Sequence, residues 1–234
     1  MSLSSSSVTQ AIFIEVNAMT ADFTTQTIVH EIEPGDTLYT LAKHYSTTVE
    51  AISKANPGID PDCLKVGHKL YIPLSLPAAI AHIRGGPLRP QIQGVVTFYK
   101  VRGGTWVCVE VKGLPPYKRA GHGQNPIGPH GFHIHEFGSC EIGDPENPFQ
   151  AAGGHYNPTN QPHGNHAGDL PVLFSNDGYA RMCFFTNAFT PHDVIGKAVI
   201  IHENPDDYRS QPAGNAGRRL ACGVITHVNP FEVS

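Results

Sequence analysis

From Ile92 onward the sequence alternates between apolar and other residues, and this period of two constrains the fold more than any other feature. The run Thr105–Val111 is an example, and Arg102-Gly103-Gly104 before it is typical of a hairpin turn. Later runs of the same kind span residues 131–137, 180–185, 198–203 and 220–225. Because few segments show helical spacing, we predict an all-β sandwich or barrel with long loops for residues 92–234.

Composition excludes several classes of protein. The 234 residues include 16 Lys and Arg, 20 Asp and Glu, and no basic patch, which argues against binding to nucleic acid. No apolar run approaches the ~20 residues of a bilayer span, so no membrane span is expected. Residues 1–27 form a polar N-terminal extension without the basic and apolar regions of a secretion signal. The unusual number is 14 His, ten of which lie between His122 and His227.

The spacing of several histidines predicts a metal site. His133 and His135 lie two apart on an expected strand, so both side chains leave the same face. The long loop 138–171 and a later apolar strand carry further candidate ligands, namely His155, His163, His166, Asp169 and His202. A set with one carboxylate suits Zn(II), whereas an all-histidine set suits Cu(II). Four histidines lack such context and are expected to be ordinary surface residues: His122, His130, His192 and His227.

Five motifs in this part of the chain occur together: Gly131–Gly138, Gly153–Pro158, His163–Leu170, Val199–Asp207 and Gly214–Val224. In these motifs and their order, residues 92–228 resemble a copper/zinc superoxide dismutase. The resemblance implies a Greek-key barrel or sandwich that binds copper and zinc. It also implies an enzyme that converts superoxide to O2 and hydrogen peroxide as copper alternates between Cu(II) and Cu(I).

By position, the resemblance implies a role for each candidate residue. The copper ligands would be His133, His135, His155 and His202. The zinc ligands would be His155, His163, His166 and Asp169, so that His155 bridges both ions and carries a proton in turnover. Asp206 would orient one histidine of each site, and Arg219 would attract the anionic substrate. Cys140 and Cys222 would form a disulfide.

Two features depart from the family pattern. His163 and His166 are three apart, a shorter spacing than in many members, which leaves open the rigidity of the site and the subunit contacts of a homodimer. The stretch 206–219 lacks a cluster of Lys, and residues 92–234 carry 10 Lys and Arg against 12 Asp and Glu. Attraction of superoxide is therefore expected to depend on Arg219 and its neighbour Arg218.

Residues 28–73 show a separate pattern of strand, helix, helix and strand. The β-rich runs at 28–32 and 69–73 flank two short segments with helical spacing, and Asp36 or Thr37 would cap the first helix. The second helix would end at Asn56-Pro57-Gly58. We therefore predict a small α+β domain here, followed by a linker over residues 74–91.

This domain resembles a LysM module in its Ile32–Leu38 opening, its Ile52–Pro57 turn and its Leu64–Pro73 ending. The resemblance implies binding to glycans that contain N-acetylglucosamine, such as peptidoglycan or chitin. The glycan contacts that it implies are Gly35, Asp36, Thr37, Asn56, Pro57, Gly58 and Ile59. The alternative is a module for protein contact or assembly.

Five cysteines leave three beyond the implied pair. Cys108 and Cys183, on expected strands, are predicted to be buried free thiols, and Cys63 lies in the small domain. A disulfide and a wall-glycan module favour the cell envelope, a spore or the exterior, whereas the missing secretion signal favours the cytoplasm. The alternative to an enzyme is a metal-binding, dismutase-like β-sandwich without turnover.

Overall fold

The computed structural model describes residues 26–74, 76–119, 121 and 127–228. The chain divides into two compact units between Leu76 and Pro77, and each unit is described by itself. Most of the predicted extension 1–27 lies outside the described residues. Within the described part, no helix is long and apolar enough to cross a membrane.

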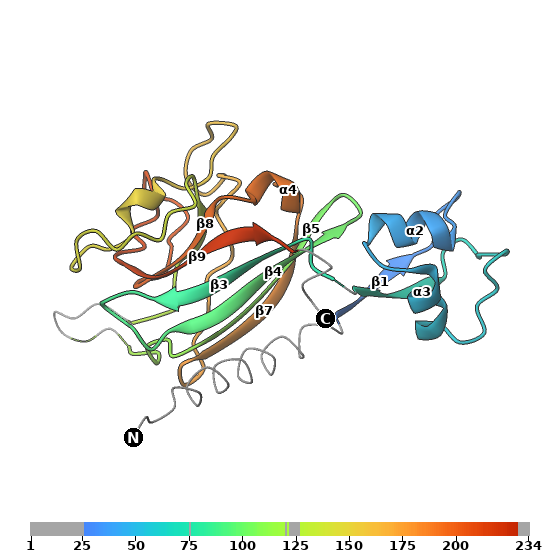
Figure 1. The fold of residues 1–234 in the computed structure, drawn as a ribbon, viewed down its shortest axis with the longest axis horizontal. Coiled ribbons are helices and arrows are strands. Elements are labelled where there is room, and N and C mark those ends of the chain that lie inside the picture. Colours follow the sequence, from blue (N-terminus) through green and yellow to red (C-terminus); the bar gives the residue numbers. More distant parts are fainter. Residues whose placement is uncertain (1–25, 75, 120, 122–126, 229–234) are drawn as a thin grey trace, which may run out of the picture. The chain divides into compact units, whose positions relative to one another are not determined.

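The first unit has the predicted order of strand, helix, helix and strand (Figure 1). Its elements are β1 (Gln26–Glu31), α2 (Leu38–His44), α3 (Val49–Ala55) and β2 (Lys69–Leu74). The two strands pair antiparallel from Gln26 opposite Leu74 to Glu31 opposite Lys69. The helices bury their apolar faces with the inner face of β2, and the core side chains include Leu38, Leu41, Ile52, Leu70 and Ile72.

Thr37 caps helix α2, as one of the two predicted alternatives. Its Oγ1 accepts from the backbone N–H of Thr40 (3.0 Å), and Oγ1 of Thr40 accepts from the N–H of Thr37 (3.0 Å). These reciprocal bonds form a capping box that satisfies two exposed donors at the helix start. Asp36 instead accepts from the N–H of Glu33 (2.8 Å) and contacts Nε2 of His30 (2.8 Å). Both loop side chains therefore hold the local turn.

The second unit is built on one antiparallel sheet of seven strands in the order β6-β8-β9-β3-β4-β5-β7. The strands are β3 (Ala79–Gly85), β4 (Gln93–Val101), β5 (Gly104–Lys112), β6 (Phe132–His135), β7 (Tyr179–Thr186), β8 (Ala198–His202) and β9 (Arg219–His227). A 3₁₀ turn, η1 (Gln150–Ala152), and a short helix, α4 (Pro191–Val194), lie in the connections. β6 and β7 follow one another in the chain but lie at opposite ends of the sheet, so the all-β prediction is confirmed with a crossing topology.

The linker predicted over residues 74–91 is wrong for strand β3. This strand lies in the middle of the sheet, between β4 and β9, and pairs Ala79 with both Phe98 and His227. Its inward residues include two alanines, which give a weak alternation of hydrophobicity, and prolines at 77, 87 and 90 flank it on both sides. The flanking prolines and the weak alternation therefore explain why the sequence did not predict this strand.

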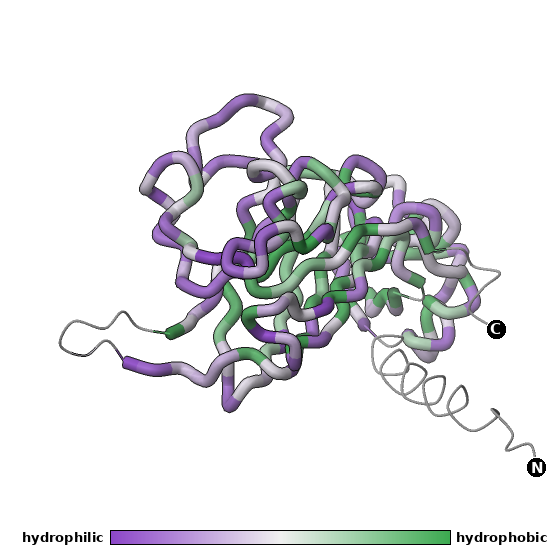
Figure 2. Tube along the Cα trace, turned by 60° about the vertical axis from the view of Figure 1, so that its left-hand side comes forward, coloured by the Kyte–Doolittle hydropathy of each residue, from purple (hydrophilic) through white to green (hydrophobic). Residues whose placement is uncertain are grey.

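The main apolar core of the second unit collects side chains from all seven strands, which requires the sheet to curve around it. Figure 2 shows hydrophobic residues along the strands and hydrophilic ones along many of the loops. In β6, Phe132 and Ile134 are fully buried in this core. The segment 156–173 runs along the edge of β6 that does not face β8. For example, the N–H of Tyr156 donates to the carbonyl oxygen of Ile134 (2.8 Å), and the N–H of Ile134 donates to that of Gly168 (2.9 Å).

Two disulfides are present in the described residues. Cys140–Cys222 ties the loop after β6 to β9, as the resemblance implied. Cys108–Cys183 is a second bridge, so the prediction of free thiols at these positions is wrong. The two cysteines lie directly opposite one another on β5 and β7, a register that sequence alone does not reveal. Cys63 is free and exposed.

Replacement of Ile134 by Ala should destabilise the second unit by about 3 kcal/mol, because the side chain is fully buried and its loss leaves a cavity. The measurement is urea unfolding of the metal-free protein, followed by the fluorescence of Trp106, the single tryptophan, which lies on β5. Ile142→Ala is the matched control, since Ile142 is 45% exposed and should change stability by less than about 0.5 kcal/mol. Equal losses in the two variants would contradict this placement of the core.

Candidate metal centre

The structure gathers every predicted metal ligand into two adjoining groups. In each group the potential ligand atoms lie within 4.8 Å of one another. The first group is His133, His135, His155 and His202. The second group is His155, His163, His166 and Asp169. His155 belongs to both, which places it between the two candidate ion positions.

Strands supply most of the first group. His133 and His135 leave β6 on the face opposite Phe132 and Ile134, and His202 ends the neighbouring strand β8. Nε2 of His135 lies 3.3 Å from Nε2 of His202. His155 comes from the long loop and is bridged to His135 through the backbone. Its ring is stacked on that of His133, with centroids 3.9 Å apart.

Four buried imidazole nitrogens have no hydrogen-bond partner among the described residues: His133 Nδ1, His155 Nε2, His163 Nδ1 and His166 Nδ1. A buried polar atom without a partner is costly, and native structures avoid it. Nδ1 of His163 lies 3.3 Å from Oδ2 of Asp169, and Nδ1 of His166 lies 3.3 Å from Oδ1, so both nitrogens adjoin the same carboxylate. Imidazole and carboxylate are ligands for copper and zinc. The residues present therefore fit both ions.

Asp169 organises the second group through both carboxylate oxygens. Oδ1 lies 2.8 Å from Nδ1 of His155, and Oδ2 accepts from the N–H groups of Gly164 (2.8 Å) and His166 (3.0 Å). Burial by itself raises the pKa of Asp169, but the bonds from His155 and Gly164 outweigh it and lower the pKa below its usual range. The carboxylate is thus ionised at neutral pH.

Asp206 connects the two groups. Nε2 of His133 donates to Oδ2 (2.6 Å), and Nε2 of His163 donates to Oδ1 (2.8 Å). Burial raises the pKa of Asp206, while these bonds and one from the Tyr208 N–H lower it by more. A carboxylate bonded to the outer nitrogen of each ring fixes its tautomer and orientation. In each ring, Nδ1 is left with a lone pair that can coordinate a metal ion.

Three histidines of the first group, His133, His135 and His202, are neutral at pH 7. Burial, assisted by the charge of His155, lowers the pKa of His133 to about 4 despite its bond to Asp206. Burial and the nearby Arg219 lower the pKa of His135, and burial with His133 lowers that of His202. Since only neutral imidazole can coordinate, these three side chains need no proton release before they bind an ion at neutral pH.

Arg219 lies beside the first group at an open cavity of about 410 Å³, whose lining includes His135, His155 and His202. Its guanidinium donates to the carbonyl oxygens of Phe149 (2.5 Å) and Gly153 (2.7 Å), which fix its direction. Burial lowers the pKa of Arg219, but a guanidinium stays charged in proteins. The cavity therefore presents a fixed positive charge beside the ligand nitrogens.

Arg218 was predicted to add positive charge near the substrate, but an acidic residue compensates it. It pairs with Glu203 through two bonds of 2.9 Å, from Nε to Oε2 and from Nη2 to Oε1. This fork compensates its charge. The cavity lining contains Arg219 and no other Lys or Arg of the described residues.

His130 is fully buried, so its assignment to the surface is wrong. Its Nδ1 lies 3.0 Å from the carbonyl oxygen of His202 and 3.1 Å from that of Glu203, and it thereby braces the end of β8. Its position directly before the apolar start of β6 was the signal in the sequence. His192 and His227 are exposed as expected, and His122 lies outside the described residues.

Comparison with known proteins agrees with this geometry. The family model described as "Copper/zinc superoxide dismutase (SODC)" matches residues 92–225, more than half of the 234 residues. The chain belongs to the copper/zinc superoxide dismutase family. A "Superoxide dismutase [Cu-Zn]" of Deinococcus radiodurans is 38% identical over 156 residues, which cover 59% of this chain and 80% of that protein.

Other relatives of this dismutase family agree. A "Superoxide dismutase [Cu-Zn] 2" of Aquifex aeolicus is 35% identical over 150 residues, covering 58% of this chain and 80% of that protein. The solved structure titled "Cu/Zn superoxide dismutase from Brucella abortus" matches with a TM-score of 0.51 and 30% identity, over 62% of this chain and 98% of that one. A LysM domain model matches residues 30–73, so the predicted order of the two modules is confirmed.

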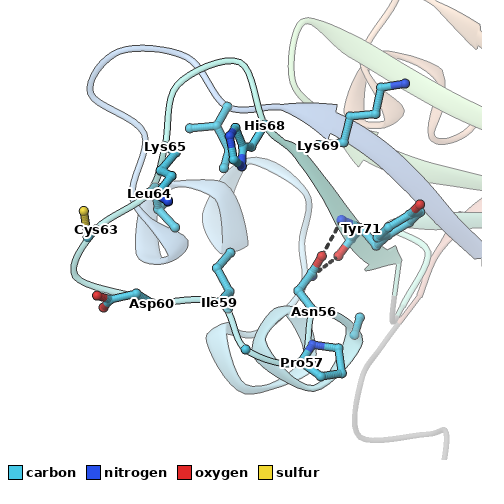
Figure 3. Close-up of a pocket in the computed structure, with 13 residues that line it drawn as sticks. Asn56, Pro57, Ile59, Asp60, Cys63, Leu64, Lys65, His68, Lys69 and Tyr71 are labelled. Carbon is cyan, nitrogen blue, oxygen red and sulfur yellow. Dashed lines mark hydrogen bonds between the residues drawn. The ribbon is translucent and has the colours of Figure 1, made fainter.

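The LysM domain contains a cavity of about 580 Å³, and only some of the predicted glycan contacts line it (Figure 3). Asn56, Pro57, Gly58 and Ile59 line it, together with residues that the sequence did not single out, such as Lys65, His68 and Tyr71. Gly35, Asp36 and Thr37 do not line it. Lys65, His68 and Tyr71 lie on β2 and its preceding loop, nine to fifteen positions after Asn56 in the sequence, and only folding brings them beside it.

Asn56 holds this cavity together. Its Oδ1 accepts from the Tyr71 N–H (2.8 Å), and its Nδ2 donates to the carbonyl oxygen of Tyr71 (2.6 Å) (Figure 3). Nδ2 also donates to the carbonyl oxygen of Ile52 (2.7 Å). The amide is therefore saturated by the backbone of α3 and β2. Its role is to position the wall of the cavity, which Ile59 and Tyr71 also line.

The metal-free protein should lose stability as the pH falls from about 6.5 towards 4. The pKa of His133 is about 4 in the folded protein against 6.5 for an ordinary histidine, so the unfolded chain binds more protons in this window. The measurement is the free energy of unfolding in urea with a chelator present, at pH 7.5 and pH 5. A value that is unchanged or larger at pH 5 would contradict the buried neutral histidines.

Proposed function

We propose that this chain is a superoxide dismutase in which His133, His135, His155 and His202 bind copper. The second group, His155, His163, His166 and Asp169, binds zinc. The observation that carries the proposal is the pair of ligand groups joined at His155, with Arg219 facing the open side of the all-histidine group. A site of this form offers a redox ion to a small anion and keeps a second ion away from it.

Copper, when bound, supplies the one-electron chemistry, and redox-silent zinc supplies charge and rigidity. Overall, two superoxide anions and two protons give one O2 and one hydrogen peroxide. The fixed guanidinium of Arg219 draws the anion into the cavity and orients it against the rings of His135 and His202. The domain as a whole has a net negative charge and would repel an anion, so the attraction comes from the local charge of Arg219.

His155 is placed to move a proton. Its Nε2 faces the first group and has no hydrogen-bond partner among the described residues, while Nδ1 faces Asp169. The proton is held at Nε2 and passed to the reduced product, while Asp169 keeps the ring aligned. Asp206 holds His133 and His163 so that neither ring turns as the charge of the site changes.

We further propose that the LysM domain tethers the enzyme to a glycan that contains N-acetylglucosamine, as in peptidoglycan or chitin. Its match to the LysM family and the cavity beside Asn56 support this. The cavity favours Pro57, Gly58 and Ile59 as contacts over Gly35, Asp36 and Thr37. The tether and two disulfides together favour the cell envelope or exterior. A homodimer stays a hypothesis.

His202→Ala should abolish dismutation and remove copper, because His202 belongs only to the first group. We expect the original protein to bind one copper and one zinc per chain, and the variant to retain zinc. Metal analysis and the rate of superoxide consumption are the two measurements. His192→Ala, at an exposed histidine outside both groups, is the control and should behave as the original protein. A fully loaded but inert original protein would support the alternative of a binding protein without turnover.

Ile59→Asp in the full chain should reduce retention on insoluble peptidoglycan or chitin by about tenfold, since it places a charge in the wall of the cavity. The measurement is the fraction of protein that sediments with the polymer. Ile142→Asp, an exposed change in the dismutase domain, should leave retention unchanged. Equal retention of Ile59→Asp and the original protein would exclude this cavity as the glycan site.

A further inference from the structure

The two ligand groups are supported in different ways. Three members of the first group lie on β6 and β8, where backbone ladders fix them. The other three members of the second group, His163, His166 and Asp169, lie on a loop outside any named strand. Only Gly164 and Asn165 separate the two histidines of that loop. A loop of this kind needs support from elsewhere to hold its ligands in place.

Tyr208, in the loop after β8, provides one such support. Its hydroxyl donates to the carbonyl oxygen of Leu170 (3.0 Å) and accepts from the N–H of Val172 (2.9 Å), just beyond Asp169. Its own N–H donates to Oδ1 of Asp206 (2.7 Å). One residue therefore connects the carboxylate between the two groups to the end of the ligand loop.

Gln211 provides the second support at the other end of the ligand loop. Its Oε1 accepts from the backbone N–H of His163 (2.9 Å), and its Nε2 donates to the carbonyl oxygen of the same residue (3.3 Å). The side-chain amide thus pairs with both backbone polar groups of one ligand residue. Neither Gln211 nor Tyr208 belongs to a ligand group.

The loop that carries Tyr208 and Gln211 is itself braced. Oδ1 of Asp207 accepts from the N–H groups of Arg209 (2.9 Å) and Ser210 (2.7 Å), and Oδ2 accepts from the Ser210 hydroxyl (2.6 Å). Several bonds to one carboxylate stabilise this turn. The supports are therefore attached to a segment that has its own hydrogen bonds.

The close approach of the two loops depends on Gly164. Its φ of +93° lies in the region that glycine adopts freely, and a Cβ there would lie 2.5 Å from the carbonyl oxygen of Tyr208. Any other residue would push the loops apart. The backbone contact and the side-chain bonds thus join the same two segments.

We propose that Tyr208 and Gln211 are positioning residues for zinc, which hold the loop of His163, His166 and Asp169 in the geometry that binds the ion. The proposal rests on the zinc site of the proposed function. Because three of the four histidines of the first group lie on strands and do not depend on these bonds, loss of either side chain should weaken zinc binding far more than copper binding.

The test measures zinc and copper affinity of the full chain by competition with chromophoric chelators. Tyr208→Phe removes only the hydroxyl, and Gln211→Ala removes both bonds to His163 together with one to the carbonyl oxygen of Arg209. Each should weaken zinc binding by about tenfold, the lower end of what loss of a residue supporting a ligand costs, with copper affinity within about twofold. Tyr117→Phe, at a tyrosine that is 59% exposed, is the control and should change neither affinity.

A second readout is hydrogen exchange of single backbone amides, which follows the bonds directly. In Tyr208→Phe the amide of Val172 should exchange faster, and in Gln211→Ala that of His163 should. Zinc affinity within twofold of the original in both folded variants would overturn the inference, as would equal losses of copper and zinc. If the original protein bound no zinc, the proposed zinc site itself would fail, and the inference with it.

Discussion

The metal centre depends on the alternation of side chains along strand β6. Phe132 and Ile134 point into the apolar core, and the pleat therefore sends His133 and His135 to the opposite face. Burial of the two apolar residues fixes the register against β8, which brings His202 to the same place. A slip of one residue would reverse both faces, so core packing and ligand placement are one constraint.

The rest of the centre is attached to this rigid edge by polar bonds. His155 crosses from the long loop to the first group, and Asp206 joins a histidine on a strand to one on a loop. Tyr208 and Gln211 extend the same network to the backbone of the ligand loop. Half of the centre thus takes its geometry from the sheet, and half from hydrogen bonds between two loops.

Electrostatics divides the work in a similar way. Burial keeps His133, His135 and His202 neutral, while hydrogen bonds keep Asp169 and Asp206 ionised. The positive charge of Arg218 is compensated by Glu203, so the cavity presents that of Arg219, held by two backbone carbonyls. A domain with net negative charge can attract an anion because this one charge is placed where the anion reacts.

The sequence by itself determined the two modules and singled out the candidate ligands, because motifs and a period of two are local properties. The family resemblance added the Cys140–Cys222 disulfide. Strand β3 was not predicted, because its small residues give a weak hydrophobic alternation and prolines flank it. The Cys108–Cys183 disulfide was not predicted, because the sequence of neither strand reveals their register. His130 was assigned to the surface for lack of a motif. The supports of the zinc loop, the pairing of Arg218 and the walls of the LysM cavity join distant residues, so only tertiary packing decided them.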